Sequence, residues 1–369
     1  MFVEFNISKN LIYIIFFSIC YGSYIFFIRY LTRKFNDNHK YPKTTFEILL
    51  LIVLSLNSFS IISILFFFIQ KKRNEAHKIK KTKQQNIIII NKNVKYELKF
   101  FSKEKLNFII LINLIFIIIF SIQYPLFYLS KISFVESNFI AQFSIFTIAI
   151  FKYIRKKNIY KHHYLSIIIL FIASLYYLIT YFDRSAKLPY FMAIIYYIYL
   201  GINFVILKYL IEIKFINLFV ILFYRGIINL ILFIFFLFNF DKHKVRKRYY
   251  DDFVKEKLIL FIIFIIINFL MKLTELKILK ELSPAKLVIG YLFGITYYVF
   301  YHLIKFNEKK KKFIFHLFID LFIILGAMVY CELIIFKFCG LEYNTKKYIK
   351  EREKNEDKET PLLYENQKD

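Results

Sequence analysis

The sequence contains no tryptophan and little glycine, proline or cysteine. Its 369 residues include 7 glycines, 5 prolines and 3 cysteines. The cysteines Cys20, Cys331 and Cys339 show no metal-ligand spacing, and so few thiols exclude a disulfide-rich scaffold. Catalytic signatures such as GxSxG, HExxH and the phosphate-binding P-loop are absent. These absences give no support to the corresponding enzyme classes.

Acidic residues are also scarce relative to basic ones. The chain has 26 Asp and Glu against 53 Lys and Arg, for a formal net charge of +27. In a soluble protein this excess would favour a nucleic-acid partner. Here the lysines lie between long apolar runs, where they meet anionic lipid headgroups. We therefore expect the lipid bilayer as a partner and no nucleic acid.

Apolar residues make up 59% of the chain, with a mean hydropathy of +0.51. A hydrocarbon core of about 30 Å needs roughly 20 apolar residues per helix. Ten runs approach this length, near residues 11–31, 46–70, 106–128, 133–154, 164–182, 189–211, 216–240, 257–271, 285–304 and 313–337. The sequence therefore predicts an all-α polytopic membrane protein with about ten transmembrane helices.

The charge of the connecting segments predicts an internal repeat. The most basic connections follow spans two, four, seven and nine, so a shift of five spans maps the first pair onto the second. A duplicated five-helix unit must be inverted in the membrane. We expect two inverted five-helix repeats at 1–184 and 185–340, with a basic low-complexity loop at 71–105 and a disordered charged tail at 341–369.

The same loops give conflicting evidence on orientation. In the first half, the positive-inside rule favours a cytosolic N-terminus. The basic loops of the second half would then be lumenal, against the rule. Because the earliest spans usually dominate, we expect both termini to be cytosolic.

A few polar residues interrupt the apolar runs. Charge at the bilayer centre costs on the order of 3 kcal/mol, so such residues are rare and usually functional. Arg225 and Asp320 lie within predicted spans seven and ten, and Arg225 could meet a substrate phosphate or a carboxylate such as Asp320. Gly290 and Gly294 form a GxxxG pair, which allows close helix packing.

Two short motifs contain residue types that are used in metal binding or catalysis. His162 and His163 lie in a predicted basic loop with no third ligand nearby in sequence, so we expect no metal site. The acidic pair Asp251–Asp252 is the only support for a polytopic glycosyl- or acyltransferase, and a solvated charged loop explains it more simply. We expect the protein not to be an enzyme and to need no cofactor.

Several segments, in the same order along the chain, resemble those of one family, the nucleotide-sugar transporters of the drug/metabolite transporter superfamily. These segments are IRYLTRK (28–34), YPKTT (41–45), QFSIFT (142–147) and MKLTELKILK (271–280), together with the spacing from Glu212 to Arg225. Ser144 stands where the family has a lysine, and Gly226 where it has an asparagine. The group that carries UDP-N-acetylglucosamine, UDP-galactose or CMP-sialic acid is the most similar.

The resemblance implies ten helices in two inverted repeats and antiport of a nucleotide sugar against a nucleoside monophosphate. It also implies a multi-pass protein of the Golgi or endoplasmic reticulum membrane, with a possible homodimer. The substrate-binding residues that it implies are Lys272, Lys280, Arg225, Glu275, Glu212, Gln142 and Ser144. Another carrier of the superfamily, for organic phosphates or other small solutes, remains the alternative.

Overall fold

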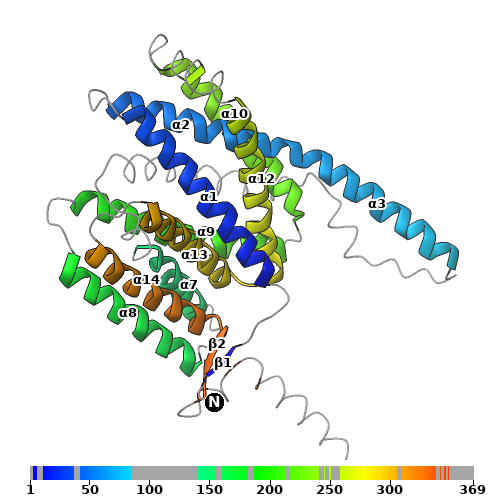
Figure 1. The fold of residues 1–369 in the computed structure, drawn as a ribbon. Helices are drawn as coiled ribbons and strands as arrows, with labels where there is room; N and C mark the ends of the chain where they lie inside the picture. Colours follow the sequence, from blue (N-terminus) through cyan, green and yellow to red (C-terminus); the bar gives the residue numbers. More distant parts are fainter. Residues whose placement is uncertain are drawn as a thin grey trace, which may run out of the picture.

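A computed structural model describes most of the helical part of the chain (Figure 1). The described residues are 3–5, 11–36, 42–84, 140–154, 160–181, 187–212, 216–240, 258–305 and 310–337, with the isolated positions 245, 249, 250, 341, 345 and 348. The predicted span at 106–128, the start of the span at 133–154, and almost all of the predicted tail lie outside these residues.

The described elements are nearly all α-helical. In chain order they are β1 (Val3–Phe5), α1 (Leu11–Asn36), α2 (Pro42–Ser58), the 3₁₀ turn η1 (Phe59–Ile62), α3 (Ser63–Gln84), α7 (Phe143–Ile154), α8 (Lys161–Tyr181), α9 (Lys187–Glu212), α10 (Leu218–Asn239), α12 (Leu258–Glu281), α13 (Pro284–Lys305), α14 (Lys310–Tyr330) and β2 (Ile334–Phe336).

Five apolar helical stretches are long enough to cross a membrane. They are Leu11–Ile28, Glu47–Asn74, Ala193–Glu212, Leu218–Asn239 and Leu258–Glu281. Three shorter apolar helices, Phe143–Ile154, Lys161–Tyr176 and Leu317–Tyr330, accompany them. Large apolar side chains such as Ile12, Ile259 and Phe318 point outward and are more than half exposed, as suits contact with lipid. The chain is an all-α membrane protein.

Helices α1 and α13 pack closely because glycines face each other across their interface. A Cβ atom added to Gly294 would lie 2.8 Å from Tyr21 Cδ1 and 2.9 Å from the backbone oxygen of Ser18. One added to Gly22 would lie 2.9 Å from the Gly294 oxygen. The close packing expected of the GxxxG pair is therefore confirmed.

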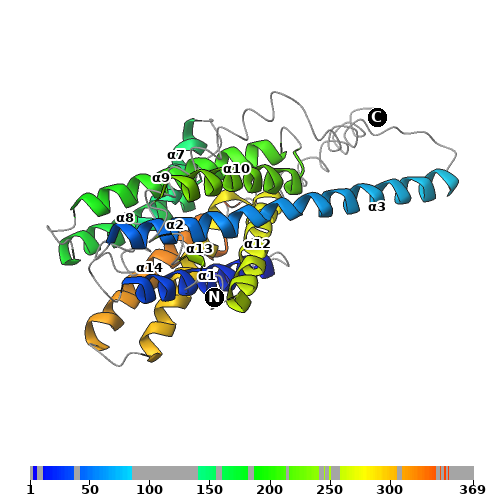
Figure 2. The same cartoon turned by 90° about the horizontal axis from the view of Figure 1, so that it is seen from above.

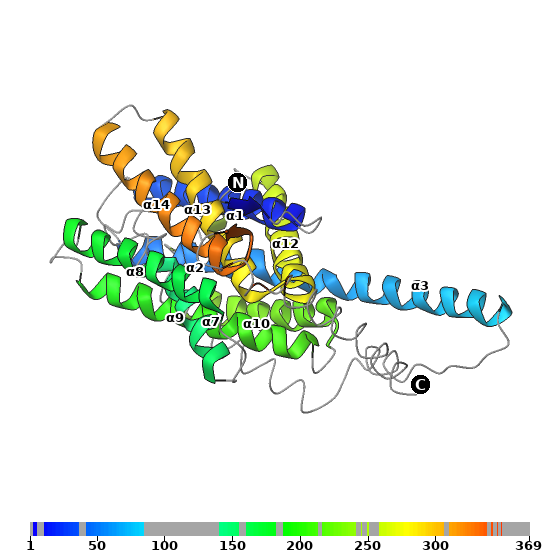
Figure 3. The same cartoon turned by 90° about the horizontal axis from the view of Figure 1, so that it is seen from below.

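Three further helix pairs shape the bundle: α7 with α9, α2 with α10, and α8 with α14. Figures 2 and 3 show α8 and α14 on one flank of the bundle and α3 projecting from the opposite end. Ser166 on α8 donates a 2.6 Å hydrogen bond to the backbone oxygen of Gly326 on α14. Such small-residue contacts let membrane helices approach without a hydrophobic driving force.

Several predicted boundaries were wrong. Residues 71–84 are helical and continue α3, so the predicted loop 71–105 does not begin at Lys71. Helix α12 continues to Glu281, ten residues beyond the predicted span 257–271. The last span ends at Tyr330, before β2, and the pair His162–His163 lies in the first turn of α8. At 71–84, 272–281 and 161–163, basic or polar residues extend a helix beyond its apolar part, whereas the last helix ends before its predicted boundary.

The two short strands join distant parts of the chain. β1 pairs with β2 in antiparallel fashion, with Val3 opposite Phe336 and Phe5 opposite Ile334. Figure 1 shows the pair beyond the ends of the helices, close to the N-terminus. The start of α1 and the end of α14 therefore reach the same region of the molecule.

Candidate functional site

Helix α12 carries a polar stripe on an otherwise apolar helix. Asn268, Lys272 and Glu275 follow one another at spacings of four and three residues, which places them on one helical face. Lipid would penalise this face, so it must turn toward the bundle. Asn268 does so by donating hydrogen bonds to the Leu56 oxygen at 3.2 Å and to Asn57 Oδ1 at 3.1 Å.

Glu275 is the centre of a buried charge cluster. Its Oε1 lies 3.2 Å from Arg225 Nη1 on α10, and its Oε2 lies 3.1 Å from Lys272 Nζ. Tyr291 on α13 donates its hydroxyl to the same Oε2 at 3.2 Å. We call these four residues, Arg225, Lys272, Glu275 and Tyr291, the charge cluster. Three helices meet at one carboxylate.

The cluster holds an excess of positive charge away from water. The side chains of Glu275, Arg225 and Lys272 are 1%, 7% and 14% exposed. Two cations and one carboxylate carry a formal net charge of +1. Guanidinium and ammonium groups form strong charge-assisted hydrogen bonds with carboxylate or phosphate oxygens. The arrangement is therefore suited to binding an anionic group.

Aromatic rings surround the hydroxyl end of the cluster. The Tyr291 ring packs edge-on against Tyr21 and Phe17 of α1, with ring centroids 4.5 and 4.9 Å apart. It stacks on Phe204 of α9 at 5.5 Å. Rings in such contact are held rigidly and exclude water from the ion pairs. This excludes bulk solvent from one side of the cluster.

Two of the residues implied by the resemblance lie apart from the cluster. Lys280 is exposed in the last turn of α12, eight residues or about 12 Å along the axis from Lys272. Glu212 forms an ion pair with Lys208 one turn earlier on α9, and its side chain is half exposed. The expected spacing from Glu212 to Arg225 therefore does not produce a pair in this structure, where the carboxylate beside Arg225 is Glu275.

Gln142 and Ser144 are both fully buried, but they bond to other helices. Gln142 donates to Ser174 Oγ on α8 at 2.6 Å, and Ser144 donates to the Tyr197 backbone oxygen on α9 at 2.8 Å. At this crossing a Cβ on Gly201 would come within 2.9 Å of the Ser144 oxygen. Ser144 thus joins α7 to α9 at a point of close approach.

Gly226 follows Arg225 on α10, at the position where the resemblance implies an asparagine. It faces the 3₁₀ turn η1, and a Cβ atom there would lie 2.5 Å from the backbone nitrogen of Ile61 and 2.9 Å from the Ser60 carbonyl carbon. An asparagine has no room at this position. The glycine lets α10 lie against η1 and so fixes the height of Arg225 in the bundle.

Tyr291 carries no signal in the sequence, because it is one of 30 tyrosines. The sequence also leaves open the partner of Arg225, for which Asp320 is one candidate. Asp320 is buried on α14 with 1% exposure, and the carboxylate at Arg225 is Glu275. Only the polar stripe of α12 could have identified this pairing.

No protein-family model matches this chain, and a comparison with curated proteins finds no match.

Proposed function

We propose that this protein is a nucleotide-sugar antiporter of an internal membrane, with the charge cluster as its phosphate-binding site. One observation carries the proposal: a buried cluster with net positive charge lies among helices long enough to cross a membrane. Charged groups within membrane segments usually mark a pathway for ions or substrates. The identity of the substrate rests on the resemblance of residues 271–280 and of the Arg225 position.

The chemistry of a diphosphate fits the two cations. A guanidinium can bind phosphate oxygens with two parallel hydrogen bonds, and an ammonium supplies a compact point charge. Arg225 and Lys272 are held by Glu275 in the present state. A phosphate group would take the place of this carboxylate, so Glu275 acts as the internal counter-ion of the empty carrier.

Helix packing supports an inverted repeat. If α1 to α8 and α9 to α14 form the repeats, a shift of five spans relates α1 to α9 and α7 to α13. The packed pair α1 with α13 then has its counterpart in α9 with α7. The pairs α2 with α10, α7 with α13, and α8 with α14 are mapped onto themselves. A carrier with this symmetry would alternate its access by rocking one repeat against the other.

Exchange rather than one-way transport is what the family resemblance implies. A nucleotide sugar and a nucleoside monophosphate both carry phosphate, so both can bind Arg225 and Lys272 in turn. Preloading vesicles with UMP is expected to accelerate UDP-sugar uptake by at least tenfold, and equal rates in empty and preloaded vesicles would exclude exchange.

The test is uptake of radiolabelled UDP-N-acetylglucosamine and UDP-galactose into proteoliposomes. We expect Lys272→Ala to lower the uptake rate at least tenfold, because it removes a buried cation of the cluster. Lys280→Ala, a charge loss on the exposed end of the same helix, is the matched control and should retain most of the rate. A wild-type rate for Lys272→Ala in correctly folded protein would refute the phosphate site.

A second candidate has one observation in its favour. The rings around Tyr291 pack against one another at 4.5 to 5.5 Å, so they leave no stacking slot for a nucleobase in this state. A carrier for a small organic phosphate would need no such slot. In the same proteoliposomes, uptake of labelled glucose 6-phosphate or phosphoenolpyruvate without uptake of UDP-sugars would select this candidate.

A further inference from the structure

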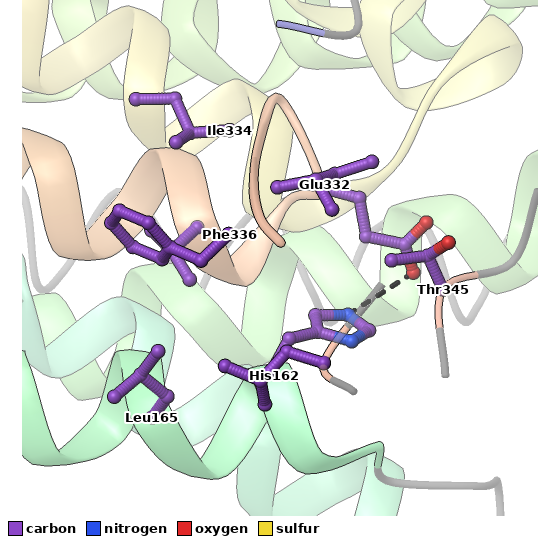
Figure 4. A pocket seen from close by; sticks show the side chains of 9 residues that line it. His162, Leu165, Glu332, Ile334, Phe336 and Thr345 are labelled. Carbon is purple, nitrogen blue, oxygen red and sulfur yellow. Dashed lines mark ion pairs between the residues drawn. The ribbon is translucent and has the colours of Figure 1, made fainter. Parts of the chain in front are cut away.

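A second polar cluster lies where the start of α8 meets the end of α14. None of its residues belongs to the charge cluster. His162 and His163 are in the first turn of α8, and Glu332 follows the end of α14. Each residue offers a ligand atom within 4.8 Å of the other two. His162 Nε2 lies 3.2 Å from Glu332 Oε1. Figure 4 marks this pair with a dashed line. We call these three residues the His–Glu cluster.

Glu332 occupies a backbone position that normally takes glycine. Helix α14 ends in a Schellman motif, in which the Leu333 N–H bonds to the Met328 oxygen at 2.9 Å and the Glu332 N–H to the Val329 oxygen at 3.1 Å. Glu332 is the left-handed residue of this motif, with φ of 57°, and no other described residue except glycine has positive φ. Strain of this kind concentrates at functional positions. The side chain at 332 therefore has a use that a glycine would not provide.

The two histidines are buried, with 5% and 3% exposure. His162 Nδ1 is enclosed and has no hydrogen-bond partner in the described part of the chain. A buried polar atom left unsatisfied is rare and calls for an unseen partner. His162 thus has a lone pair or an N–H that the protein does not use.

Two neighbouring groups can donate a hydrogen bond to the His163 ring, and Lys152 would compete there with a metal ion. His163 Nδ1 accepts from the Tyr160 N–H at 3.2 Å, while Lys152 Nζ lies 3.1 Å from Nε2. A neutral imidazole has a single lone pair in the ring plane, so it cannot accept from both groups. Lys152 Nζ also lies 4.8 Å above the centre of the Tyr330 ring, which gives it an alternative contact.

We propose that His162, His163 and Glu332 form a binding site for a divalent metal ion of the zinc type. Two imidazole nitrogens and one carboxylate oxygen are the ligands that zinc and its first-row neighbours take in proteins, whereas magnesium and calcium prefer oxygen alone. The hollow beside the cluster is lined mostly by apolar side chains such as Leu165, Ile334 and Phe336 (Figure 4). A bound ion would tie the first turn of α8 to the end of α14.

The test uses full-length purified protein in detergent, stripped with a chelator and titrated with ZnCl₂ or CoCl₂. Calorimetry is expected to give one zinc ion per chain, and cobalt is expected to give visible d–d absorption bands of a low-coordinate site. Zinc should also raise the melting temperature of the wild-type protein by several degrees, since a ligand that binds only the folded state stabilises it.

Glu332→Gly is the decisive variant, because glycine is the favoured residue at this backbone position. Without metal it should be at least as heat-stable as the wild type, which rules out misfolding. With zinc it should show at least a tenfold loss of affinity and little rise in melting temperature. His162→Gln should lose affinity similarly, and His316→Gln, a change sixteen residues before Glu332 on α14, should not.

Lys152→Met tests the competitor. It removes the ammonium but keeps a chain of similar length near Tyr330, and we expect it to bind zinc several-fold more tightly than the wild type. Equal zinc affinity in the wild-type and Glu332→Gly proteins, or the absence of a zinc-dependent change in melting temperature, would overturn the proposal. In that case Glu332 serves only as an ion-pair partner of His162.

Discussion

The buried carboxylate of Glu275 connects three helices of this membrane protein. It accepts from the Arg225 guanidinium, the Lys272 ammonium and the Tyr291 hydroxyl, which belong to three helices. Each cation would be costly in the bundle without it. The residue is therefore a structural counter-ion as well as part of the proposed phosphate site.

Glu275→Gln keeps the shape of the side chain and removes its charge. The two cations then lose the carboxylate that they share, and we expect a loss of about 3–5 kcal/mol in the free energy of unfolding. Thermal unfolding of the purified protein in detergent measures this loss. The protein level in membranes should fall in parallel.

The matched double variant separates charge from packing. Glu275→Gln combined with Lys272→Met lowers the buried net charge from +2 to +1, so it should recover part of the lost stability. If the double variant is less stable than Glu275→Gln by the full cost of Lys272→Met alone, the two residues are not coupled and the assigned role of Glu275 is wrong.

At the scale of elements, glycines on both helices bring α1 and α13 into close contact. It brings Phe17 and Tyr21 of α1 against Tyr291 of α13, one hydrogen bond from Glu275. The distance between these helices therefore sets the position of the Tyr291 hydroxyl. A change in helix packing here should reach the charge cluster.

Gly294→Ala tests this packing. Its Cβ would lie 2.9 Å from the Ser18 backbone oxygen, which cannot move without shifting α1. We expect a destabilisation of about 1–3 kcal/mol, the usual range for overpacking. Thermal unfolding checks the stability, and the uptake assay checks whether the displaced Tyr291 slows transport.

Gly326→Ala is the control for that experiment. Its Cβ would meet Leu170 Cδ2 and Cγ at 2.9 Å, and a leucine side chain can change rotamer. The cost should therefore be smaller than for Gly294→Ala. The reverse order of stability would show that α1 and α13 are not held at the distance described.

At the scale of the whole molecule, the sequence predicted the class and most helices correctly. Apolar runs of about 20 residues identify membrane helices because lipid demands internally bonded backbone. Helix ends were harder, since polar residues at 71–84 and 268–281 continue a helix once it is started. Hydropathy identifies the residues that contact lipid. It does not identify the residue at which the backbone hydrogen bonds of a helix end.

The site was only partly predictable, for a similar reason. Arg225, Lys272 and Glu275 stood out because charge is rare in apolar helices, but their mutual contact depends on the packing of α10 against α12. Tyr291 and Glu332 carried no comparable signal. Glu332 lies 170 residues after His162, so only the fold brings this third side chain to the histidines. The expectation of no metal site rested on distance along the sequence, which does not report this proximity.

The pairing of β1 with β2 also limits how the chain threads the membrane. Residues 3–5 and 334–336 are hydrogen-bonded neighbours, so they lie on one side of the bilayer. The polypeptide between them must therefore cross an even number of times, a count that ten crossings satisfy and nine do not. Single cysteines placed just before Val3 and just after Phe336 should react with a membrane-impermeant thiol reagent from the same side. Labelling from opposite sides would show that the strands do not pair in the membrane-embedded protein.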